Sequence, residues 1–202
     1  MTILSETRAQ RTANSGGRGV DVTLTNVRLV LDDRVVDDAT IVVRDGIIEA
    51  AGSVAHAPPD AIDGHGLFCL PGLIDTHSDG FEKELRPRPN VMLPVDFALR
   101  SFESRVRGAG VTTVFHGVGF ENGSKYDRSV AQAHDLCNAI TERRGQADAR
   151  VDHHILHRLD VRDADGLDAL DARLRDRHGD LPCADVPPVS ARHPPPGREQ
   201  LT

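Results

Sequence analysis

Aromatic side chains, cysteine pairs and long apolar runs are scarce in this chain of 202 residues, and each shortage excludes a class of protein. Aromatic residues make up 3% and tryptophan is absent, so any core depends on Leu, Val, Ile and Ala. No apolar run approaches the roughly 20 residues that cross a bilayer, so we expect no membrane partner. The three cysteines, Cys69, Cys137 and Cys183, form no Cys-x-x-Cys pair, which favours reduced thiols in a cytoplasmic protein over disulfides.

Basic residues are outnumbered as well. The chain has 24 Lys and Arg against 31 Asp and Glu, and the net charge of -7 argues against nucleic acid as a partner. Residues 1–19 are rich in Ser, Thr, Gly and Arg and lack the apolar segment of a signal peptide. We therefore expect a disordered tail over 1–19.

Residues 20–70 read as a small β unit. Apolar and β-branched residues predict strands over 22–31, 39–43 and 47–52, and a break in the first strand is expected near Asn26. The Asp45-Gly46 pair between the second and third strands is a typical hairpin turn.

Residues 71–178 alternate between strand and helix patterns. Val111–Phe115 is a continuous run typical of a buried parallel strand, and 151–161 predicts another. Apolar residues at helical spacing predict three intervening helices, the first capped by Asp96, so the fold class is α/β with parallel βαβ units. Residues 179–202 are dense in proline and show no strand or helix pattern, which predicts disorder.

The most informative motif follows Pro71-Gly72. A short apolar run ends in Asp75-Thr76-His77-Ser78-Asp79, and on a strand Asp75, His77 and Asp79 share one face. Imidazole and carboxylate two residues apart can bind one divalent metal, and zinc, manganese and iron accept these ligands. A buried strand with a polar end is the alternative interpretation.

These segments resemble the amidohydrolase superfamily, in which a small β-sandwich precedes a metal-binding (β/α)8 barrel. The stretches VRDGIIEAAG (43–52) and IDGHGLFCLPGLIDTHSD (62–79) carry the resemblance, which extends from Val20 to about Arg175. Most members have His-x-His where this chain has His77-x-Asp79. That difference, with Glu82-Lys83 and Pro87-Arg88-Pro89 after it, is similar to the diphosphatase branch of phosphonate metabolism.

The resemblance implies a metal site and a phosphate site. His77, Asp79 and Asp160 match the positions of ligands to a divalent metal, although Asp160 could instead cap the next helix. Lys83, Arg86 and Arg88 match a loop suited to the phosphate oxygens of a substrate. Alternatively, Arg86 and Arg88 are solvated or pair with the carboxylates of Glu82 and Glu84.

The function that the resemblance implies is metal-dependent release of pyrophosphate from α-D-ribose 1-methylphosphonate 5-triphosphate. A complete barrel takes about 250 residues, whereas this sequence holds about three of eight βα units, so we expect an incomplete barrel whose catalytic Asp lies outside the chain. We therefore expect a carboxy-terminally truncated, inactive fragment with a small-molecule substrate as the partner of the whole enzyme. Two alternatives stay open: an amidohydrolase that cleaves C–N bonds, such as a deacetylase or cyclic amidase, and a non-catalytic remnant. Self-association into a homo-oligomer also stays open.

Overall fold

The computed structural model describes residues 21–53, 58–123, 128–177 and 189–192. The chain divides into two compact units, Met1–Pro71 and Gly72–Thr202, and each is described by itself. The expected tail over 1–19 lies outside the described residues.

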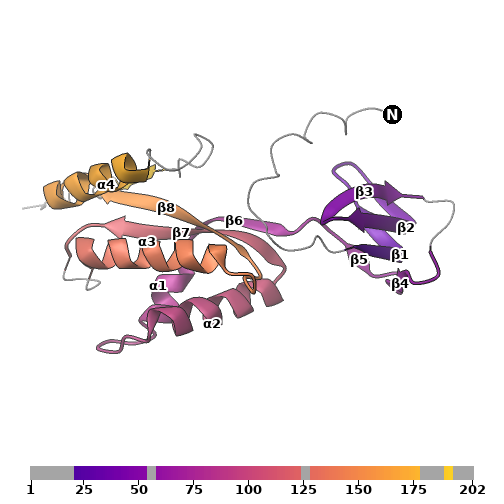
Figure 1. Cartoon of the computed structure of the whole chain (residues 1–202), viewed down its shortest axis with the longest axis horizontal. Coiled ribbons are helices and arrows are strands. Elements are labelled where there is room, and N and C mark those ends of the chain that lie inside the picture. Colours follow the sequence, from indigo (N-terminus) through magenta and orange to yellow (C-terminus); the bar gives the residue numbers. More distant parts are fainter. Residues whose placement is uncertain (1–20, 54–57, 124–127, 178–188, 193–202) are drawn as a thin grey trace, which may run out of the picture. The chain divides into compact units, whose positions relative to one another are not determined.

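The first unit is a small β-sheet (Figure 1). The strands of the expected β-sandwich form one five-stranded sheet of order β3-β2-β1-β4, with β5 also paired to β1. Its core consists of Val27, Leu29, Ala39 and Ile41. The strands are β1 (Val22–Val30), β2 (Val35–Arg44), β3 (Ile47–Gly52), β4 (Ile62–Asp63) and β5 (Phe68–Cys69).

Two turn residues fix the register of this sheet. Asp45 and Gly46 both have positive φ, at 50° and 73°, as the tight turn between β2 and β3 requires. Asn26, at φ 52°, coincides with a register shift between β1 and β2. The predicted break in the first strand is therefore a β-bulge within β1 rather than a strand end.

The second unit alternates strands and helices, as the sequence predicts. Its four strands are parallel and lie in the order β6-β7-β8-β9. The elements are β6 (Leu73–Ser78), α1 (Gly80–Leu85), α2 (Val95–Gly108), β7 (Val111–Phe120), α3 (Val130–Gly145), β8 (Asp152–Asp160), α4 (Ala164–Arg177) and β9 (Val189–Arg192).

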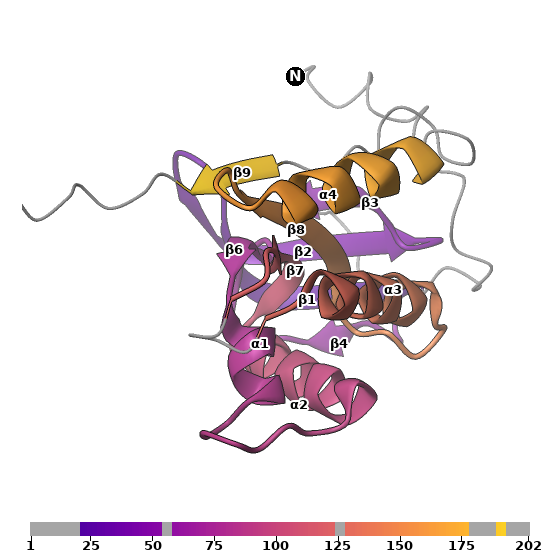
Figure 2. The same ribbon diagram turned by 90° about the vertical axis from the view of Figure 1, so that its left-hand side faces the viewer.

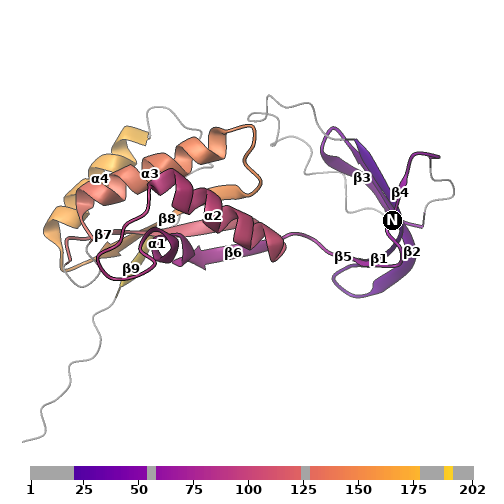
Figure 3. The ribbon, with the colours of Figure 1, turned by 90° about the horizontal axis from the view of Figure 1, so that it is seen from below.

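The two faces of this parallel sheet have different surroundings. Figures 2 and 3 show α2, α3 and α4 on the same side of β7 and β8. Along β7 every second side chain, from Val114 to Phe120, is buried against these helices. The residues between them, including Gly117 and Gly119, lie on the opposite face, which we call the inner face.

Two predicted boundaries differ from the structure. The helix α2 begins at Val95, and Asp96 lies in its first turn instead of capping it. The expectation that 179–202 has no secondary structure is wrong for Val189–Arg192, which form β9. This strand pairs with the otherwise free edge of β8, and such pairing satisfies backbone groups whatever the local composition.

Two further sequence expectations concern thiols and membranes. Cys69 and Cys137 are free thiols, and Cys183 lies outside the described residues. Within the described ranges, every helix is too short or too polar to cross a bilayer.

Candidate metal and phosphate site

Polar side chains gather at the carboxyl end of β6, beside β7 and β8. In parallel sheets the carboxyl ends of the strands meet at one edge, where ligands of α/β proteins usually bind. The register pairs Ser78 of β6 with His116 of β7, and His116 with Ile155 of β8. The motif that follows Pro71-Gly72 therefore lies at the carboxyl end of β6, beside the middle of β7 and β8.

His77 and Asp79 lie close together at this end of β6. His77 is the next-to-last residue of β6, and Asp79 precedes the first turn of α1. The Nε2 atom of His77 is 3.9 Å from the Oδ1 atom of Asp79, and both side chains are partly exposed. The carboxylate of Asp75 instead accepts a hydrogen bond from the backbone N–H of His77.

Arg158 of β8 contacts the same carboxylate. Its Nη1 donates to Oδ1 of Asp79 at 2.5 Å, and its side chain is 8% exposed. Gly117 leaves the necessary room, because a Cβ there would lie 2.9 Å from Cδ of Arg158 and 3.0 Å from Oδ1 of Asp79. Arg158 carries no motif of its own in the sequence, although a glycine within a strand is a signal of close approach by another group.

The structure does not bring Asp160 to His77 and Asp79. Asp160 is five residues beyond the level of Ile155 on β8, which is roughly 16 Å along a strand. Its carboxylate accepts hydrogen bonds from Nε and Nη2 of Arg162 at 2.9 and 2.6 Å. These bonds, with the backbone N–H of Arg162, lower the pKa of Asp160 to about 2.

The alternative that Asp160 caps the next helix is wrong. The residue that caps α4 is Asp163, whose side-chain Oδ1 accepts a hydrogen bond from the backbone N–H of Gly166.

The three predicted phosphate-binding residues have different surroundings. Lys83 is an exposed residue of α1, and Arg88 is exposed beyond it. Arg86 is partly buried, and its Nη2 donates to Oε1 of Gln132 on α3. The neighbouring carboxylates pair with distant arginines instead of Arg86 and Arg88: Glu82 with Arg128, and Glu84 with Arg105.

Arg128 lies beside a small pocket at the start of α3. It donates to both carboxylate oxygens of Glu82 at 2.6 and 2.5 Å and to Glu121 at the end of β7. The hydrogen bonds that Arg128 donates to Glu82 outweigh burial and raise the pKa of Arg128 above its usual range. The pocket is lined by Ser78, Glu82, Gly117, Arg128, Ser129 and Gln132, among others.

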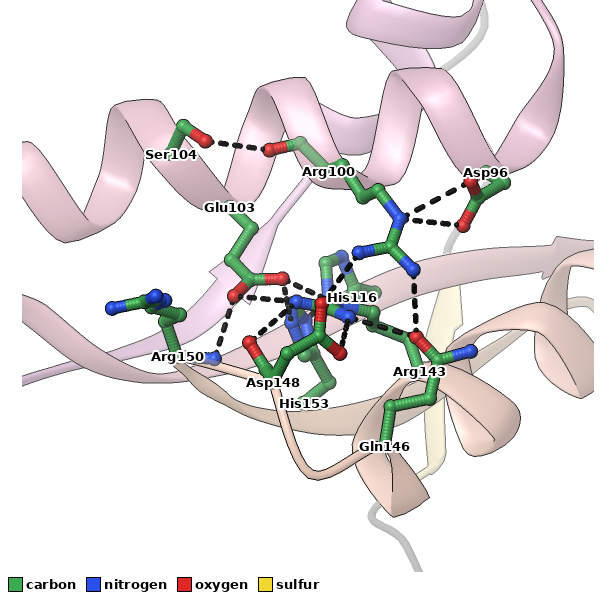
Figure 4. Close-up of polar contacts among 10 residues, drawn as sticks. All are labelled: Asp96, Arg100, Glu103, Ser104, His116, Arg143, Gln146, Asp148, Arg150 and His153. Atoms are coloured by element: carbon green, nitrogen blue, oxygen red, sulfur yellow. Dashed lines mark hydrogen bonds and ion pairs between the residues drawn. The ribbon is translucent and has the colours of Figure 1, made fainter.

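A second polar cluster lies on the helix-covered face (Figure 4). The carboxylate of Glu103 on α2 accepts from Nε and Nη2 of Arg143 on α3 at 2.6 and 3.1 Å, and from the backbone N–H of Arg150 at 2.6 Å. Burial opposes ionisation of Glu103, but these hydrogen bonds outweigh it, and the pKa of Glu103 is lowered. His153 extends the cluster, with Nε2 3.4 Å from Oε2 of Glu103.

His116 completes this cluster from β7. Its Nε2 lies 2.9 Å from Nδ1 of His153, so one ring donates to the other. Burial, together with the neighbouring His153, lowers the pKa of His116 to about 3. Both rings therefore stay neutral near pH 7, and the cluster connects α2, α3 and the sheet.

The residues present fit a divalent metal in part. His77 and Asp79 supply one nitrogen and one oxygen donor from neighbouring positions, which zinc, manganese and iron accept. Within the described ranges, no three His, Cys, Asp or Glu side chains converge on one point. The described residues therefore bring together two of the donors that a metal site would need.

Comparison with known proteins extends these observations. The chain is 31% identical over 138 residues to α-D-ribose 1-methylphosphonate 5-triphosphate diphosphatase of Escherichia coli (strain K12), across 68% of this chain and 36% of that protein. A triazine hydrolase variant has a TM-score of 0.51 at 18% identity, across 85% of this chain and 46% of its own. Guanine deaminase from C. acetobutylicum, solved with guanine in its active site, has a TM-score of 0.51 at 15% identity, across 85% and 52%. No protein-family model matches the chain.

These similarities confirm the predicted fold class and the predicted resemblance. The chain has a mixed α/β fold whose parallel sheet corresponds to part of the (β/α)8 barrel of these enzymes. It spans 36% of the length of the curated relative that it matches.

Proposed function

We propose that this chain, a member of the amidohydrolase superfamily similar to the phosphonate diphosphatase, supplies part of the metal site of a hydrolase. The observation that carries the proposal is the 31% identity to the diphosphatase, in a chain that places His77 and Asp79 together at the carboxyl end of β6. The substrate class that we propose is a ribose triphosphate carrying a methylphosphonate, with pyrophosphate as the leaving group. We further propose a cytoplasmic location and a small phosphorylated molecule as the partner.

The proposed mechanism assigns three kinds of residue. A bound divalent ion supplies Lewis-acid chemistry, which lowers the pKa of water and polarises a phosphoryl oxygen. His77 and Asp79 would hold that ion, whereas Asp160, paired with Arg162 and well beyond them along β8, stays a proposed ligand that would reach it only if the end of β8 moved. Lys83 and Arg88, both exposed, would contact phosphate oxygens, and Arg86 would do so beside Gln132.

We propose that the chain by itself does not turn over substrate. It spans 36% of the relative's length, and its described residues provide two converging metal donors, whereas a catalytic zinc site has three protein ligands. A purified sample should therefore release no pyrophosphate from the ribose triphosphate above background. Metal-dependent release that Asp79→Asn abolishes would support the substrate assignment and overturn the proposed inactivity.

Metal binding tests the site directly. Titration calorimetry with zinc or manganese should detect weak binding that His77→Ala removes. Tight binding that survives His77→Ala would refute the site. Hydrolysis of N-acyl substrates in place of the triphosphate would favour the alternative of C–N bond cleavage.

A further inference from the structure

We propose that Arg158 is an internal counter-ion of Asp79, which a divalent cation must displace before His77 and Asp79 can bind it. This inference rests on the proposed function, because it assumes that these two residues are metal ligands. Arg158 is a positioning residue in this account, since it acts through Asp79.

One oxygen atom of Asp79 is shared between two neighbours. The Oδ1 atom of Asp79 accepts from Nη1 of Arg158 at 2.5 Å, and the same Oδ1 lies 3.9 Å from Nε2 of His77. A cation held between His77 and Oδ1 would share this oxygen with the N–H of Arg158, which already occupies one of its lone pairs. A guanidinium keeps its positive charge at any ordinary pH, so a divalent ion at that oxygen is also repelled by Arg158.

The surroundings of Arg158 favour this pairing over a chance contact. The Arg158 side chain is 8% exposed, although an unpaired arginine would normally extend into water. Gly117 provides the space for both partners, since a Cβ at that position would lie closer to each of them than van der Waals contact allows. The pair links Arg158 on β8 to Asp79, which follows β6, and it spans the intervening strand β7.

One N–H group of the Arg158 guanidinium makes no hydrogen bond to the described residues. Within the described part of the chain, its buried Nε has no hydrogen-bond partner. Buried N–H groups normally find partners, so the present position of Arg158 does not satisfy the whole guanidinium. Release from Asp79 therefore gives up one hydrogen bond in a group that is already incompletely bonded.

The test compares metal affinities of the full chain and two matched variants. Arg158→Gln removes the counter-ion, and this variant should bind zinc or manganese about tenfold more tightly. A tenfold change in affinity is what breaking one charge-assisted hydrogen bond costs the unmodified chain. Arg144→Gln removes the same charge from a pair with Asp152 at the start of β8 and should leave the affinity unchanged. An equal or weaker affinity in Arg158→Gln would overturn the proposal.

A second measurement covers the case in which Arg158→Gln does not fold. In the unmodified chain, NMR of arginine side chains should show the Arg158 guanidinium signals changing as zinc is added. Unchanged Arg158 signals at saturating zinc would overturn the displacement.

The two proposals fail in different ways. If metal binds and His77→Ala abolishes that binding, but Arg158→Gln gains nothing, the proposed function stands and the role of Arg158 is wrong. If binding is absent, or survives His77→Ala, both are wrong.

Discussion

Glu103→Gln should destabilise the second unit by removing one partner of a buried ion pair. The side chains of Glu103 and Arg143 are 4% and 5% exposed, and two hydrogen bonds of 2.6 and 3.1 Å join them. Removing one member of such a pair typically costs 3–5 kcal/mol, because the other charge stays buried. Arg143 keeps its bond to the exposed Asp148, so we expect the low end, about 3 kcal/mol.

The measurement is urea unfolding followed by circular dichroism, with linear extrapolation to water. Asp171→Asn is the matched control, because its pair with Arg175 on α4 has side chains that are 52% and 77% exposed. That exposed pair should contribute at most about 0.5 kcal/mol. A loss below about 1 kcal/mol in Glu103→Gln would refute the reasoning that the buried pair depends on both charges.

The remaining predictions concern His116 and Gly117. Because the pKa of His116 falls from 6.5 to about 3 on folding, the unfolded chain binds more protons over that range, and the free energy of unfolding should fall as pH falls below 6.5. In His116→Gln the slope between about pH 6 and 5 should be smaller by up to about 1.4 kcal/mol per pH unit, and an unchanged slope in urea unfolding would contradict this. Gly117→Ala should cost about 1–3 kcal/mol, because its Cβ would press on Arg158 and Asp79. Gly119→Ala, whose Cβ would meet nothing nearer than 3.4 Å, should cost clearly less in the same measurement.

The sequence predicts most of the second unit because its signals are local. The β-branched run Val111–Phe115 indicates a parallel strand, and apolar spacing indicates α3 and α4. The structure continues β7 to Phe120, since pairing with β8 extends through Gly117 and Gly119, where the side-chain pattern alone is weak. The strand β9 has no local signal, because its stability depends on the neighbouring strand.

The candidate site is predictable from the sequence only where its contacts are local. His77 and Asp79 are two residues apart, so their proximity is a property of the chain itself. The contact between Asp79 and Arg158 spans 79 residues, and Glu82 meets Arg128 across 46. No spacing in a single sequence reports such contacts, which is why the sequence analysis assigned other partners to these carboxylates.

The alternation along β7 has a consequence for how this protein tolerates change. His116 and the other buried side chains of β7 pack on the helix-covered face, whereas Gly117 leaves room for Arg158 and Asp79 on the inner face. Substitutions at alternate positions can therefore alter one face and leave the other intact. Inserting a single residue before His116 would instead exchange the two faces, carrying the imidazole into the space kept for Arg158 and a glycine into the core. A substitution in β7 therefore affects one face of the sheet, whereas a single-residue insertion or deletion disrupts both faces.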